Sequence, residues 1–370
     1  MKTIGIPEYI SSGRYTHSPP RLTGSKSKNV EESEYRFLVM PRFGPDLQKI
    51  LDMMGSKIPL KAAYTIGIKV IDVLEYVHSC GYVHADVKAS NLLLNADIAD
   101  PAHAVHDQIW LVDYGLADRY ISNGSLIFPN NRYKMNHVHG QIIFASNQWI
   151  IFINLFAEKH KEYCEDKRKE NNGTVEFLAR DSHVGAFSRK GDLEILAYNI
   201  LSWISSGRLP WMSNLQDYIF VKESKLYYMD RLHELFNYAF RSNELSSSSE
   251  NSPKDNKSTR NGVKSSTKSS AKSTSTNIDL SKLTCLVPHG LIEFFQAITR
   301  LEFTETPNYA HLKEILQDAI QESGENYDET FSFQTTNNSY SRKISKTTNR
   351  KRKILIKIYI YLYYYFCFNS

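Results

Sequence analysis

The sequence predicts an α+β protein with a small β-rich part near its amino terminus and a larger, mostly helical part after it. Two stretches that are rich in β-forming residues come first, Ile4–Gly13 and Glu34–Met40. A long segment with apolar residues at helical spacing follows, at Pro59–Cys80. Two polar turns come next, and each follows a short apolar run that ends in a carboxylate. This order predicts a helical body that carries two polar turns, whose side chains are candidates for a catalytic or binding site.

Composition and charge set broad limits. A chain of 370 residues suits roughly two domains, and its net charge of +5 is concentrated in a few segments. The four cysteines are scattered, without a CxxC pair or a Cys/His metal spacing. We therefore expect free thiols in a reducing compartment. The amino terminus has no charged-then-apolar pattern of a signal peptide.

The boundaries of the early elements follow from local signals. Pro41–Asp46 breaks the second strand, and Asp46 is placed to cap a helix that starts near Leu47. In the long helix four apolar residues fall on one face: Ile66, Val70, Leu74 and Val77. Gly81 ends this helix as a C-terminal glycine does. Its apolar stripe is expected to be core.

The first polar turn lies in the stretch YVHADVKASNLLL, residues 82–94. It offers Asp86 to orient a hydroxyl, Lys88 for a phosphoryl oxygen and the amide of Asn91 for Mg²⁺. The second turn, in IWLVDYGLA, brings one more carboxylate, Asp113, beside a glycine. A lone aspartate in a turn is most often a helix cap. The two turns together, in this order, predict phosphate and metal chemistry.

The pair of turns, H-x-D-x-K-x-x-N and then D-[FY]-G, resembles the catalytic and metal-binding loops of protein kinases. The longer stretches YVHADVKASNLLL, DYGLADRY, MPRFGPDLQKIL and the run from NNGTVEF to RLPW resemble the vaccinia-related kinases, a branch near casein kinase I. The similarity covers most of Ile4 to about Asp318. It implies a protein-kinase-like two-lobed fold with an incomplete small lobe and a mostly helical large lobe.

The resemblance implies a role for each matching residue. Asp86 would accept or orient the proton of the substrate hydroxyl, and Lys88 would neutralise charge on the transferring phosphoryl group. Asn91 and Asp113 would hold Mg²⁺, and Thr174 would lie in the substrate-facing loop and help to position Asp86. The implied cofactors are ATP and Mg²⁺.

The break after the second strand would be the hinge between the lobes, where backbone groups meet the adenine of ATP. The residues expected there are Met40 and Phe43, which join Lys88, Asn91 and Asp113 as the nucleotide-binding set. Without the later motifs, an ordinary strand-to-helix turn would be the better interpretation of this break.

The sequence departs from common kinase patterns in several places. Ala85 replaces the arginine that anchors a phosphorylated activation loop, so we expect activity that is not gated by phosphorylation of that loop. Tyr114 replaces phenylalanine, and Asp181-Ser182-His183 stands where most kinases have A-P-E, as in this branch. No Gly-rich loop, strand lysine or helix glutamate precedes Tyr35. We expect either that the sequence is a truncated gene model or fragment, or that the chain cannot bind the phosphates of ATP in the usual way.

In the large lobe, Asp192 opens a run that is apolar almost all round, Leu193–Ile204, which predicts a buried central helix. Asp192 would bond the backbone of the catalytic loop, or cap its own helix, or both. Tyr218–Arg241 is expected to be helical. Arg300 is expected to pair with the substrate-facing loop.

Two segments interrupt the predicted kinase domain, residues 1–323, and a third follows it. The first is the apolar insert at about 125–158, for which there are three competing explanations. They are a retained intron, a lineage-specific insertion or docking segment, and a membrane-facing element. Residues 246–277 are rich in Ser, Lys and Thr and form a low-complexity insert. Residues 324–370 are expected to be a disordered basic tail with an apolar end. Its basic clusters suit a nuclear signal, a weak nucleic-acid contact or a solvated tail.

The function predicted from these residues is that of a serine/threonine protein kinase. We expect it to be a monomer and to act in the nucleus, with the cytoplasm as a second compartment. Its substrates would be proteins, with basic chromatin-associated proteins as candidates, and a membrane partner is not expected. Specificity for Ser/Thr rests on Lys88 and on the resemblance. The alternatives are a pseudokinase or scaffold that has lost catalysis, and a nucleic-acid-binding protein that uses its basic segments.

Overall fold

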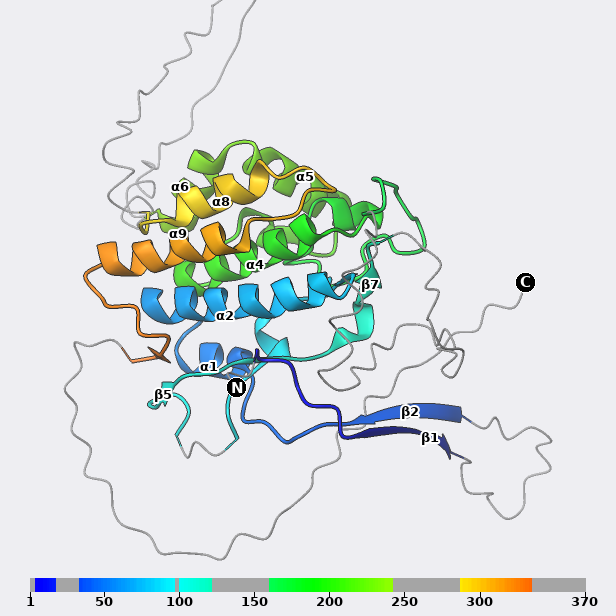
Figure 1. The fold of residues 1–370 in the computed structure, drawn as a ribbon. Coiled ribbons are helices and arrows are strands. Elements are labelled where there is room, and N and C mark those ends of the chain that lie inside the picture. Colours follow the sequence, from blue (N-terminus) through cyan, green and yellow to red (C-terminus); the bar gives the residue numbers. More distant parts are fainter. Residues whose placement is uncertain (1–3, 18–32, 97–99, 122–159, 242–286, 335–370) are drawn as a thin grey trace, which may run out of the picture.

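The helical body and the β-hairpin are separate features of the fold (Figure 1). The computed structural model describes residues 4–17, 33–96, 100–121, 160–241 and 287–334. The helices α2, α4, α8 and α9 stack in the body, and the hairpin β1–β2 extends away from it. The arrangement is the expected kinase-like α+β fold with a mostly helical large lobe. The inserts at 125–158 and 246–277 and the tail beyond 334 lie outside the described residues.

The hairpin pairs β1 (Ser11–His17) with β2 (Ser33–Val39) in antiparallel register, with Ser11 opposite Val39. The predicted second strand is confirmed to within one residue. The first strand begins later than Ile4, because the preceding segment lies against another part of the chain. The carbonyl of Gly5, at a φ of 91°, accepts a hydrogen bond from Leu111 N over 2.9 Å. A side chain at Gly5 would meet the Ile109 carbonyl oxygen at 2.5 Å.

The segment after β2 is fixed to the body by backbone hydrogen bonds. Gly44 N donates to Leu94 O over 2.7 Å, and Leu94 N donates to Pro45 O over 3.0 Å. The helix α1 (Leu47–Met53) follows, and Lys49 N donates to the Asp46 carboxylate over 3.0 Å. The expected helix cap at Asp46 is confirmed.

Helix α2 (Leu60–Ser79) packs against both α4 (Arg189–Ser205) and α9 (Tyr309–Glu322), which lie next to it in Figure 1. The predicted apolar stripe is buried, but the neighbouring faces are buried too, because helices pack on more than one side of α2. At Gly67 a β-carbon would meet the Ile200 side chain at 2.7 Å, so this glycine lets α4 approach closely. Gly81, at a φ of 83°, follows the end of α2 as expected.

Short strand pairs hold the polar turns. They are β3 (Tyr82–Val83) with β7 (Asp118–Arg119), β4 (Leu92–Leu93) with β6 (Trp110–Leu111), and β5 (Val105–His106) with β8 (Phe331–Ser332). Short 3₁₀ turns follow at Ala89–Asn91, Tyr114–Leu116, Asp181–Val184 and Pro210–Asn214. The packed chain continues past residue 323, where the sequence placed the end of the domain. The side chains of Phe331 and Phe333 are buried, and both rings contact His106.

The remaining helices complete the large lobe. They are α5 (Tyr218–Met229), α6 (Leu232–Phe240) and α8 (Leu291–Thr299). Helix α4 is buried from Gly191 to Ser205, as its apolar run predicts. Within the described ranges Cys80 and Cys164 are free thiols. None of the helices in those ranges is long and apolar enough to cross a bilayer.

Candidate active site

The turn that carries Asp86, which is the predicted catalytic loop, is anchored by hydrogen bonds to Asp192 on α4. Its two carboxylate oxygens accept hydrogen bonds from the backbone N–H groups of His84 and Ala85, each over 2.7 Å. The carboxylate also contacts His78 Nε2 at 2.9 Å. The expected bond to the loop backbone is therefore present. The alternative role as a helix cap is wrong, because Ser188 caps α4 by accepting from Gly191 N over 3.1 Å.

His84 joins the two polar turns. Its fully buried ring accepts from Asp86 N at Nδ1 over 3.3 Å and lies 3.2 Å from Val112 O at Nε2. These contacts require a proton on Nε2 and none on Nδ1. Burial lowers the pKa of His84 despite the nearby carboxylates, which keeps the ring neutral. A neutral His84 thus holds the residue before Asp113 against the catalytic loop.

Asp86 lies at the centre of a compact polar cluster and is 7% exposed. Its Oδ1 accepts from Thr174 N over 3.0 Å and from the Thr174 hydroxyl over 2.7 Å. Its Oδ2 forms an ion pair with Lys88 Nζ at 2.7 Å, and Lys88 also donates to the Thr174 hydroxyl over 2.9 Å. The sequence separates Thr174 from Asp86 by 88 positions. The structure brings all three residues into direct contact.

Asn91 and Asp113 lie on adjacent backbone segments. Val112 N donates to Asn91 O over 2.9 Å, which places the turn that carries Asp113 beside Asn91. Asn91 Nδ2 donates to Asp86 O over 2.9 Å, and in the described part of the chain no donor reaches Asn91 Oδ1. Asp113 adopts a left-handed conformation, with a φ of 65°. An amide oxygen and a carboxylate are both hard oxygen donors, so the chemistry of these two residues fits Mg²⁺.

The predicted hinge residues lie apart from this cluster. Met40 follows the end of β2 and is half-buried. The ring of Phe43 packs on the indole of Trp110, with 5.0 Å between ring centroids. Because Trp110 begins the strand β6 that leads to Asp113, this contact connects the segment after β2 to the turn that carries Asp113. Contact of Met40 or Phe43 with a nucleotide stays a prediction.

Sequence reasoning missed a buried ion pair behind the substrate-facing loop. Arg180 binds Glu194 with its Nη2 over 3.0 Å and with its Nε over 3.1 Å, and Arg180 N adds a bond of 2.8 Å. Burial raises the pKa of Glu194, but Arg180 outweighs burial and holds it below the ordinary value. Glu194 is also bonded by the Tyr198 hydroxyl over 2.8 Å. One signal was available, since Glu194 is the charged residue in the run Leu193–Ile204.

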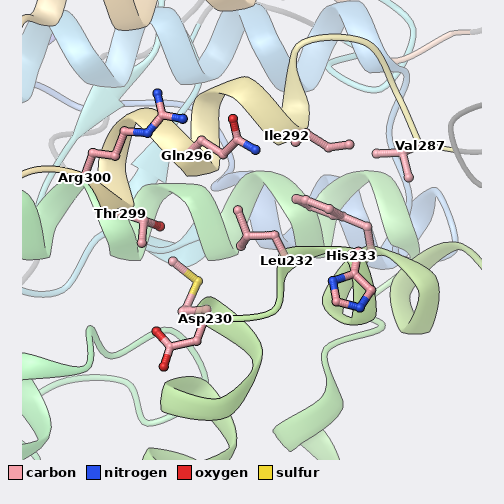
Figure 2. Close-up of a pocket in the computed structure, with 10 residues that line it drawn as sticks. Asp230, Leu232, His233, Val287, Ile292, Gln296, Thr299 and Arg300 are labelled. Atoms are coloured by element: carbon pink, nitrogen blue, oxygen red, sulfur yellow. The ribbon is translucent and has the colours of Figure 1, made fainter. Parts of the chain in front are cut away.

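The expected partner of the substrate-facing loop, Arg300, lies elsewhere. Figure 2 shows it near Thr299 and Asp230 in the lining of a cavity of about 660 Å³ between α6 and α8. Among the described residues no ion pair joins Arg300 to loop 173–178. The predicted pairing is wrong, and Arg180 and Glu194 provide the ion pair next to the loop. The residues of the catalytic loop do not line this cavity.

Comparisons with known proteins show which proteins this chain is similar to. The profile of the protein kinase domain matches residues 26–166. The chain is 37% identical to the serine/threonine-protein kinase VRK2 of Homo sapiens over 62% of this chain and 34% of that protein. The chain is therefore similar to the vaccinia-related kinases. The chain is also 32% identical to nucleosomal histone kinase 1 of Drosophila melanogaster over 58% of this chain and 26% of that protein. It is 34% identical to the B1 kinase of Vaccinia virus (strain Ankara) over 50% of this chain and 47% of that protein.

A solved structure of vaccinia related kinase 3 shares the fold. It superposes with a TM-score of 0.53 at 21% identity and covers 87% of this chain and 69% of that chain. The chain spans about a third of the length of VRK2 and about a quarter of the length of nucleosomal histone kinase 1. The predicted family and fold class are confirmed.

Proposed function

We propose that this chain transfers the γ-phosphoryl group of ATP to serine or threonine hydroxyls of protein substrates. The observation that supports this most directly is the cluster of Asp86, Thr174 and Lys88, with a carboxylate and an ammonium held 2.7 Å apart. Phosphoryl transfer depends mainly on positioning and electrostatics, so fixed geometry matters more than a shifted pKa.

Each side chain has a role that its contacts support. Asp86 orients the incoming hydroxyl and accepts its proton. Lys88 is 27% exposed at its side chain, so its ammonium reaches a phosphoryl oxygen while it stays next to Asp86. Asn91 and Asp113 would hold Mg²⁺, which supplies positive charge that neutralises the phosphates of bound ATP. Thr174 orients Asp86.

The proposed substrates are basic, chromatin-associated proteins, and the proposed compartment is the nucleus. This part rests on the relatives, one of which is named a nucleosomal histone kinase. Contact of the basic tail with nucleic acid and the monomeric state stay predictions, and the tail lies outside the described residues.

The test is transfer of labelled phosphate from ATP to a basic protein. Asp86→Asn should reduce transfer by about 10²–10⁴-fold, because the hydroxyl loses its proton acceptor. Asp72→Asn is the matched control: this half-exposed carboxylate pairs with Lys313 on the surface at 2.7 Å and should leave transfer within about twofold.

Nucleotide binding is measured beside transfer as the shift in melting temperature with MgATP. A shift that Asp86→Asn retains, together with lost transfer, supports the proposal. Wild-type protein with neither transfer nor a shift would favour the scaffold alternative. Transfer that persists undiminished in Asp86→Asn would contradict the role of Asp86.

A further inference from the structure

The side chain of Lys225 is fully buried, and among the residues that the structure describes no carboxylate forms an ion pair with it. Its Nζ donates to Val175 O over 2.7 Å and to Leu178 O over 2.8 Å, and lies 3.4 Å from His183 Nε2. The rings of Tyr198 and Trp211 flank the ammonium, at 5.4 and 5.3 Å. Burying a charge that has no opposite charge in contact costs free energy, so the hydrogen bonds of this ammonium must offset that cost.

The three N–H groups of the ammonium match three acceptors. Two of them are carbonyl oxygens. The third is His183, whose Nδ1 lies 2.8 Å from Asn171 Oδ1 and therefore carries the ring proton, which leaves Nε2 as an acceptor. Burial lowers the pKa of His183 to about 3, with help from the positive charge of Lys225, so the ring stays neutral. The site thus fits a three-donor group and not an apolar side chain of the same length.

Both carbonyls belong to the substrate-facing loop that carries Thr174. Phe177 N and Leu178 N each donate to Thr174 O over 2.9 Å, so the loop turns tightly between Thr174 and Leu178. The Thr174 end of this turn contacts Asp86, and the other end contacts Lys225. The two ends of the turn pack closely, because a β-carbon added at Gly173 would lie 2.7 Å from Leu178 Cδ1.

We propose that Lys225, on α5, is a positioning residue that fixes the loop 174–178 and thereby holds Thr174 against Asp86. The proposal rests on the proposed function in one respect only, the consequence for phosphate transfer. The Trp211 indole supports the same loop by donating to Glu176 O over 2.8 Å. The loop is therefore held at the carbonyls of Val175, Glu176 and Leu178, from α5 and the turn before it.

The experiment compares Lys225→Met with wild type in the full chain by hydrogen exchange of the amides of Thr174, Phe177 and Leu178. Exchange should be about tenfold faster in the variant, because hydrogen bonds to a charged donor are lost. Lys190→Met is the matched control, since its ammonium also donates to a backbone carbonyl, that of Leu301, over 2.7 Å. This control should leave exchange in loop 174–178 within about twofold.

Stability separates positioning from simple support of the fold. Lys225→Met removes the desolvation cost of the buried ammonium but leaves its three acceptors unpaired, so its melting temperature should fall by no more than a few degrees while its loop exchanges faster. Lys225→Arg retains a charge and several donors and should recover slow exchange. If Lys225→Met does not fold, Lys225→Gln replaces it with the same readouts.

Phosphate transfer is the last readout. Lys225→Met should lower kcat about tenfold with KM for ATP within about twofold, because Thr174 and not the nucleotide is displaced. Equal loop exchange in Lys225→Met, Lys190→Met and wild type would overturn the proposal. Faster exchange without transfer in any form would support the positioning role and reject the proposed kinase activity, so the two failures are distinguishable.

Discussion

Asp192, on α4, contacts the backbone of Ala85, and its Oδ1 accepts a hydrogen bond from Ala85 N over 2.7 Å. Ala85 has a φ of 65°, in the left-handed region that costs a residue with a β-carbon about 1–2 kcal/mol. The carboxylate thus fixes a backbone conformation that the chain would not adopt alone. This conformation directs the next residue, Asp86, toward Thr174.

Asp192→Asn should destabilise the protein and loosen the catalytic loop. The amide offers one acceptor in place of two and places an NH₂ group against a backbone N–H. The expected loss is about 2–4 kcal/mol of unfolding free energy, measured by urea denaturation.

Ser188→Ala is the control for this position. It removes only the cap of the same helix and should cost about 1 kcal/mol. Equal losses from the two variants would indicate that Asp192 contributes no more than an ordinary helix terminus.

Thr174→Val should lower kcat for protein phosphorylation. It keeps the shape of the side chain but removes the hydroxyl that donates to Asp86 and accepts from Lys88. We expect about a 10–100-fold loss of kcat and a melting temperature within a few degrees of wild type. Thr174→Ser restores the hydroxyl and should recover most of the rate. A rate that follows side-chain volume instead of the hydroxyl would argue against this role.

Arg180→Met should be strongly destabilising because it leaves Glu194 buried and without its main partner. The Glu194 side chain is 3% exposed, and the loss is expected to be about 3–5 kcal/mol of unfolding free energy. The double variant Arg180→Met with Glu194→Gln removes both charges and should recover at least half of that loss. Chemical denaturation of the two single variants and the double variant completes the cycle. Additive losses would show that the pair is not coupled.

Stability should rise with pH above neutrality because of Lys225. Burial lowers the pKa of this amine to about 7, and Glu194 and Glu176 offset burial only in part. In the unfolded chain the amine keeps its proton up to its ordinary pKa of 10.5. Between these values the unfolded chain binds more protons, so the unfolding free energy increases with pH, by at most about 2–3 kcal/mol from pH 7 to 9.

Lys225→Met should lose this increase, and urea denaturation at pH 7 and pH 9 measures it. The comparison uses the difference between wild type and variant, so groups common to both cancel. A difference that is independent of pH would show that Lys225 does not titrate in this window.

Local signals in the sequence were sufficient for several parts of the fold. The cap at Asp46, the long helix α2 and its glycine end were predicted correctly, because caps and helical periodicity depend on residues a few positions apart. The start of β1 was not, because Gly5 lies along Leu111, which is distant in the chain. The packing of Phe331 and Phe333 on His106 was missed for the same reason.

The sequence by itself determined which residues carry the chemistry: Asp86, Lys88, Asn91 and Asp113 follow from two short motifs, and Thr174 from the resemblance. Only the tertiary structure decided what holds them. It placed Thr174 on Asp86, paired Arg180 with Glu194 instead of involving Arg300, and buried Lys225 behind the substrate-facing loop. These contacts join residues on different helices and loops. Their free energy depends on burial and on mutual distance, and neither quantity is a property of a local pattern.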